Sequence, residues 1–103
     1  MRIKEVTEEY ILFDNNYKIT YDHNQDCCEW NFAEFNQVEP LALTTEFDED
    51  LKFEAVKDGG FRFGNSDKMF FVPCYSVQSG YYSTDVDIYY KEERVLNTEA
   101  EEL

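Results

Sequence analysis

The sequence predicts an α+β fold, a mostly antiparallel sheet of about five or six strands with one short helix packed on it. Several segments alternate apolar and polar residues with a period of two, and turn residues separate these segments. One segment, residues 26–35, instead spaces its apolar residues as a helix does. The length of 103 residues fits one domain, and an aromatic content of 17% supplies large side chains for its core.

Strands are predicted first at the N-terminus, beginning with residues 3–7. An apolar segment, 10–13, and an alternating segment, 17–21, then flank Asn15 and Asn16. Because asparagine tolerates a positive φ, these two residues favour a tight hairpin turn between two strands.

The predicted helix begins at Asp26, whose side chain can cap free backbone N–H groups. Glu29 follows three positions later, as in a capping box. Cys28, Phe32 and Phe35 then fall at i, i+4 and i+7, on one helical face. This spacing predicts a helix that packs its apolar face on the sheet.

Further strands are predicted after Pro40, which ends the predicted helix. Residues 51–55 alternate, and residues 69–77 are apolar on both faces, as in a central strand. Pro73 weakens that second prediction, because proline cannot donate to a strand ladder and favours an edge or a bulge. Residues 81–90 give the last predicted strand.

The predicted domain covers residues 1–96, and an acidic tail, 97–103, is predicted to fray. The chain carries 23 acidic and 9 basic residues, a formal net charge of −14. Residues 5–50 hold 13 of the acids and a single base, Lys18, so the negative charge is concentrated in the first half of the chain.

This charge argues against direct binding to nucleic acid or to an anionic membrane, because both would repel the protein. No apolar run approaches the roughly 20 residues of a membrane-spanning helix. No basic segment precedes an apolar one, so the sequence predicts no signal peptide. Three cysteines without an export signal are then expected to be reduced thiols in a cytosol.

The densest polar cluster, residues 23–29, offers the weak candidates for metal binding or thiol chemistry. His23, Cys27 and Cys28, together with the distant Cys74, are just enough ligands for zinc, but their spacing matches no known zinc pattern. Cys27 could instead be a nucleophile with His23 as its base, although no glycine loop for an oxyanion is evident. We favour a structural role for these residues, and predict no catalytic residue, no cofactor and no metal.

The concentrated negative charge suggests a protein partner with a basic surface, although charge taken alone favours a role in solubility. Carboxylates spaced over a rigid surface can imitate a row of phosphates and occupy a groove lined by Arg and Lys. The alternative is that the charge serves only solubility. The predicted partner-binding residues are seven carboxylates and two aromatic anchors: Asp14, Asp22, Glu34, Glu46, Asp48, Glu49, Asp50, Tyr17 and Trp30.

Two segments resemble a small uncharacterised family found in bacteriophages and bacteria. Residues 21–29, YDHNQDCCE, resemble its YxHxQDCCE signature, and residues 74–87 are similar to its CYxxxxGYYSxxVD block. The family is a domain of unknown function, so no activity or site residue carries over. The resemblance implies an accessory protein of a phage or mobile element, and it implies that the two cysteines of the first motif lie near Tyr81 and Tyr82.

We therefore predict a non-enzymatic protein of the bacterial cytoplasm that binds a basic, nucleic-acid-binding surface of a host protein. By steric and charge mimicry it would block a target such as a CRISPR or other defence nuclease. One alternative is a small thiol- or metal-containing module that uses residues 23–29. Another is a structural or scaffolding protein that adds a strand to a sheet edge. The partner's identity and the oligomeric state stay open.

Overall fold

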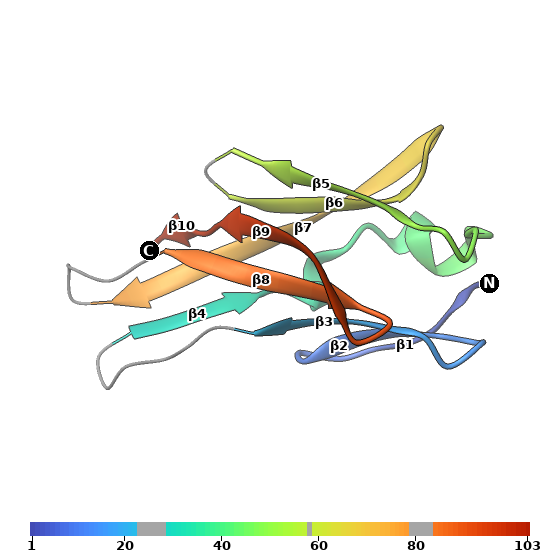
Figure 1. Cartoon of the computed structure of the whole chain (residues 1–103), viewed down its shortest axis with the longest axis horizontal. Helices are drawn as coiled ribbons and strands as arrows, with labels where there is room; N and C mark the ends of the chain where they lie inside the picture. The colour runs from blue at the N-terminus through green and yellow to red at the C-terminus, as the bar shows by residue number, and fades with distance from the viewer. Residues whose placement is uncertain (23–28, 58, 79–83) are drawn as a thin grey trace.

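The chain folds into two β-sheets that share one core, as the computed structural model shows (Figure 1). The structure describes residues 1–22, 29–57, 59–78 and 84–103, and of Glu29 and Gln78 only the backbone. The first sheet is antiparallel throughout. Its strands are, in spatial order, β1 (Ile3–Val6), β2 (Tyr10–Phe13), β3 (Lys18–Asp22), β8 (Asp85–Tyr90) and β9 (Glu93–Glu99).

The second sheet is built around the long strand β7. Its spatial order is β10 (Glu101–Glu102), β7 (Lys68–Gln78), β6 (Gly60–Asn65) and β5 (Lys52–Val56), and β4 (Glu29–Ala33) also pairs with β7. Within this sheet β10 runs parallel to β7, and the other described pairs are antiparallel.

The predicted α+β class is wrong, because the fold is mainly β. Ten strands form in the described residues, more than the five or six expected. The only helices there are two short 3₁₀ helices, η1 (Phe35–Gln37) and η2 (Pro40–Thr44). In this part of the chain, no helix has both the length and the apolar character needed to cross a lipid bilayer.

Strand β4 occupies part of the segment predicted to be helical. Asn31 and Ala33 are buried, whereas Trp30 and Phe32 point to the other face, so the true period is two. Aromatic side chains favour strands, and the five residues pair with β7 along their whole length. The proposed helix cap at Asp26 lies outside the described residues.

The apparent helical spacing arose from residues on different elements. Phe32 belongs to β4, whereas the buried Phe35 lies in η1 after the strand has ended. Pro40 begins η2 instead of ending a helix, because its missing N–H and fixed φ suit a first helical position.

Other predicted strands are confirmed. Segments 3–7, 51–55 and 69–77 correspond to β1, β5 and β7, with differences of a few residues at their ends, and the described part of segment 81–90 contains β8. Residues 81–83 of that last segment lie outside the described residues. The predicted hairpin also forms between β2 and β3. Of its two asparagines only Asn16 has a positive φ, 72°, and its N–H donates to the Phe13 carbonyl at 3.0 Å.

Pro73 lies where β7 changes partners. Residues up to Pro73 pair with β6, whereas those from Cys74 onward pair with β4, and two of them, Tyr75 and Ser76, pair with β10 as well. The Pro73 carbonyl accepts the Glu34 N–H at 2.8 Å, and the Cys74 N–H donates to the Gly59 carbonyl at 3.0 Å. Strand β7 continues through Pro73, and the residue without an N–H lies at the point where the pairing with β6 ends and the pairing with β4 begins.

Phenylalanine rings join the two sheets in the core. Phe47 comes from the loop before β5 and is 2% exposed. Its ring centroid lies 5.7 Å from that of Phe13 in the first sheet and 5.6 Å from that of Phe63 in the second. Edge and tilted contacts of this kind stabilise aromatic clusters, so this loop residue fastens one layer to the other.

The segment 97–103 is ordered within the sheets, contrary to the predicted frayed tail. Thr98 and Ala100 are buried, while Glu99 and Glu101 point outward, as alternation in a strand requires. The Leu103 N–H donates to the Ser76 carbonyl at 3.0 Å, which fixes the end of the chain against β7.

Candidate partner-binding surface

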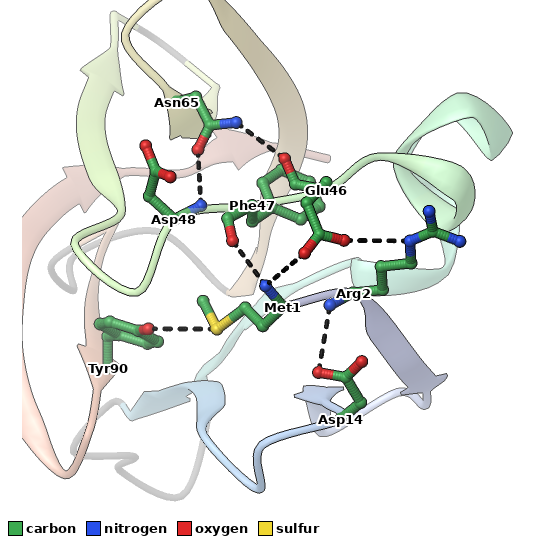
Figure 2. A network of polar contacts seen from close by, with 8 residues as sticks. All are labelled: Met1, Arg2, Asp14, Glu46, Phe47, Asp48, Asn65 and Tyr90. Carbon is green, nitrogen blue, oxygen red and sulfur yellow. Dashed lines mark hydrogen bonds and ion pairs between the residues drawn. The ribbon is translucent and has the colours of Figure 1, made fainter.

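The acidic loop, residues 46–50, is bound to the N-terminus through its backbone (Figure 2). The α-ammonium of Met1 donates to the Phe47 carbonyl at 2.7 Å, and the Phe47 N–H donates to the Met1 carbonyl at 2.7 Å. Phe47 and Leu51, in and beside the loop, are buried. The loop is thus held by both hydrogen bonds and apolar packing.

Two more side chains hold the same loop. The Asn65 side chain accepts the Asp48 N–H at 2.9 Å and donates to the Glu46 carbonyl at 2.9 Å (Figure 2). The Tyr90 hydroxyl donates to the Glu49 carbonyl at 2.7 Å. Burial raises the pKa of Tyr90 above its ordinary 10.0, so the hydroxyl keeps the proton that it donates.

Asp48, Glu49 and Asp50 carry the free charge of the loop. All three side chains are exposed, and none has an ion-pair partner among residues 1–22, 29–57, 59–78 and 84–103. Their backbone is held by the contacts above, so the carboxylates project from a fixed base. A preformed array of this kind loses little conformational entropy on binding.

Glu46 has a different role from its neighbours in the loop. Its carboxylate accepts from Nε of Arg2 at 3.0 Å and from the α-ammonium of Met1 at 3.3 Å (Figure 2). The hydrogen bond from Arg2, followed by that from the N-terminus, lowers the pKa of Glu46. The Arg2 N–H also donates to Oδ1 of Asp14 at 3.2 Å, which brings Asp14 beside the loop.

The Tyr17 ring packs against other side chains of the chain, which leaves less of it available to contact a partner. Its ring centroid lies 5.9 Å from that of Tyr90, and Nζ of Lys91 lies 4.6 Å from the Tyr17 centroid. A hollow of about 560 Å³ beside it is lined by Asn16, Tyr17, Lys18, Thr20, Lys91 and Glu92. With two lysines in its lining, this hollow does not suit a cationic partner.

A second group of the predicted residues lies in a separate hollow of about 340 Å³, here called the acidic–aromatic hollow. It contains Glu34 and Trp30, which the sequence predicted, together with residues that it did not. Its lining is Glu8, Glu9, Tyr21, Trp30, Phe32, Ala33 and Glu34. The turn between β1 and β2 lies beside β4 here. Because these segments are far apart in the sequence, no local pattern predicts this contact.

Trp30 is the more accessible of the two predicted aromatic anchors. It is 52% exposed, and its ring lies 4.5 Å from that of Phe32, with 31° between the planes. It pairs across the strands with Val77, which is also exposed. Asp22 is exposed at the end of β3, opposite Asp87 of β8. It is not part of the acidic loop, and it does not line the acidic–aromatic hollow.

Only one of the metal and thiol candidates falls in the described residues. Cys74 is fully buried, and burial raises the pKa of its thiol to about 12, which keeps it protonated at neutral pH. His23, Cys27 and Cys28 lie outside the described residues. Within the part of the chain that is described, no three His, Cys, Asp or Glu side chains are grouped to hold a metal ion.

Comparison with known proteins finds no matching protein-family model, no matching curated protein and no matching solved structure. The resemblance to a phage family therefore stays a prediction. The β4–β7 ladder pairs Glu29 with Gln78, the described residues next to the gaps at 23–28 and 79–83. The expected proximity of the paired cysteines to Tyr81 and Tyr82 lies outside the described residues.

Proposed function

We propose that this protein binds a basic, nucleic-acid-binding surface of a host protein and blocks it by occupying the surface with carboxylates. The observation that carries the proposal is the acidic loop. Asp48, Glu49 and Asp50, which have no ion-pair partner in the described part of the chain, stand on a backbone held by the N-terminus, Asn65 and Tyr90. Fixed negative charge of this kind speeds association with a positive surface and competes there with phosphates.

The rest of the charge supports the same function. No acidic side chain that the structure describes is buried, so each of these carboxylates is at least partly exposed to solvent. The three arginines already face acids of their own chain, with Arg62 Nη2 2.5 Å from Glu54 and Arg94 Nη1 3.6 Å from Asp87, besides the Arg2 pair. Six exposed lysines have no ion-pair partner in the described residues, but they are few beside the 23 acids of the chain.

The resemblance to a phage family gives the proposal its biological setting. A protein made by a phage gains from disabling a defence enzyme, and a nuclease such as a CRISPR effector carries an Arg- and Lys-lined groove. The mechanism is occupation without turnover, since the carboxylates exclude nucleic acid both by bulk and by charge.

Affinity capture from bacterial lysate tests the proposal. We expect the wild-type protein to retain a basic protein at low salt and to release it towards about 0.5 M salt, where the Debye length is only a few Å. An Asp48→Asn/Glu49→Gln/Asp50→Asn variant should retain much less of it. Added wild-type protein should also displace nucleic acid from the captured partner.

A control variant, Glu99→Gln/Glu101→Gln/Glu102→Gln, removes the same charge from exposed positions near the C-terminus, at the far end of the molecule from the N-terminus (Figure 1). It should retain the partner nearly as well as the wild type. Retention that does not change from low salt to about 0.5 M would contradict charge mimicry. Equal loss in both variants would show that net charge, and not the acidic loop, governs binding.

A further inference from the structure

The acidic–aromatic hollow combines two kinds of side chain that bind cations. Glu8 and Glu9 reach it from the turn between β1 and β2, and Glu34 follows β4. Among the described residues none of these carboxylates has an ion-pair partner, and no Lys or Arg lines the hollow. Three negative charges therefore face one concave region without an internal cation.

The aromatic side of the hollow is formed by Tyr21, Trp30 and Phe32. Trp30 stacks on Phe32 yet keeps 52% of its surface exposed. Burial, and then the charges of Glu9, Glu34 and Glu8, raise the pKa of Tyr21, in agreement with the lining of the hollow, which these three carboxylates share with the Tyr21 ring. An indole ring beside carboxylates attracts a cation through its π face as well as through charge.

We propose that this hollow binds an arginine side chain of the basic partner. Guanidinium is planar and weakly hydrated, stacks on aromatic rings and pairs with carboxylates through two parallel hydrogen bonds. Lysine offers a compact, strongly hydrated charge that gains less from an indole face. The volume of about 340 Å³ lies near the lower limit of ligand sites, which suits a single side chain. This inference rests on the proposed function and names the group by which the partner is held.

The single tryptophan of the chain makes the hollow directly observable, because Trp30 alone supplies the indole fluorescence. The probe is a tetra-arginine peptide with blocked ends, titrated at low salt and compared with tetra-lysine. We expect tetra-arginine to change the Trp30 emission and to bind at least about fivefold more tightly than tetra-lysine. In calorimetry, a Trp30→Leu variant should bind tetra-arginine about tenfold more weakly.

Two triple variants of equal charge separate the hollow from general attraction. Glu8→Gln/Glu9→Gln/Glu34→Gln should weaken tetra-arginine binding at least about tenfold, whereas Asp48→Asn/Glu49→Gln/Asp50→Asn should weaken it about threefold or less. Equal weakening by both variants, with an unchanged Trp30 emission, would overturn the hollow as the site while leaving the proposed function standing. Equal affinity for both peptides would overturn arginine as the occupant. No binding of either peptide would count against the hollow and the proposed function together.

Discussion

Glu46 differs from the other carboxylates of the acidic loop because two cations face it. Its contacts join residues that are 44 and 45 positions apart in the chain. The sequence analysis placed Glu46 among the partner-binding residues, because the sequence shows that the residue is acidic. It does not show which cationic groups of the folded chain will contact that carboxylate. Asp48, Glu49 and Asp50 could be predicted as exposed charge, because three consecutive acids have no place in a core.

Replacing Glu46 with glutamine should lower the free energy of unfolding by a small amount at pH 7, since the ion pairs are solvent-exposed. The folded-state pKa of Glu46 is lowered, so its contribution is present above the unfolded pKa of about 4.3 and is lost as the pH falls through the folded value. Urea unfolding of Glu46→Gln and wild type should differ at pH 7 and converge near pH 3. Glu39→Gln, an exposed acid with no ion pair in the described residues, serves as control, and a constant difference at both pH values would contradict the assignment.

Cys74 shows what burial does to a candidate nucleophile. With a pKa of about 12 its thiolate fraction at pH 8 is on the order of a thousandfold below that of a free cysteine. In a Cys27→Ser/Cys28→Ser background, we expect iodoacetamide to modify the folded protein at least about a thousandfold more slowly than the protein in urea. Rapid modification of the folded protein would restore Cys74 as a reactive thiol.

At the scale of elements, alternation predicted strands well and the partners of those strands poorly. The hairpin of β2 and β3 could be predicted because its turn residues and both strands are adjacent in sequence. The pairing of β4 with β7 joins Trp30 to Val77, and no local pattern specifies such a distant partner. The helix prediction was wrong because a spacing of i, i+4 and i+7 occurs by chance when a short strand and a 3₁₀ helix follow each other.

Gly60 is one of two glycines, with Gly64, at which β6 approaches the backbone of β7 too closely for a side chain. Its φ is 139°, and a Cβ there would lie 2.2 Å from the Val72 carbonyl oxygen. Gly60→Ala should therefore lower the free energy of unfolding by more than the roughly 1–3 kcal/mol that backbone strain alone costs. Such a loss is a large part of the stability of a typical domain. Gly59→Ala, where nothing lies within 4 Å of the added carbon, should change the stability by less than about 0.5 kcal/mol. Urea unfolding of both variants checks the contrast, and equal stabilities would show that the β6–β7 approach is looser than described.

At the scale of the whole molecule, the net charge of −14 was available from the sequence, but its arrangement was not. Folding divides most of the predicted partner-binding residues between the acidic loop, with Asp14 beside it, and the acidic–aromatic hollow. It also places the half-buried Tyr17 in an edge-to-face contact with Tyr90, and leaves Trp30 exposed. These outcomes depend on packing between the two sheets, which the fold class predicted from sequence did not contain.

The affinity of the protein for its captured partner, measured against salt concentration, tests the central claim most directly. The account predicts that the logarithm of the affinity falls steeply and linearly with the logarithm of the salt concentration. For the Asp48→Asn/Glu49→Gln/Asp50→Asn variant, it predicts a weaker affinity at low salt and a shallower slope. An affinity that is independent of salt, with the same value for both proteins, would contradict binding through the fixed carboxylates of the acidic loop.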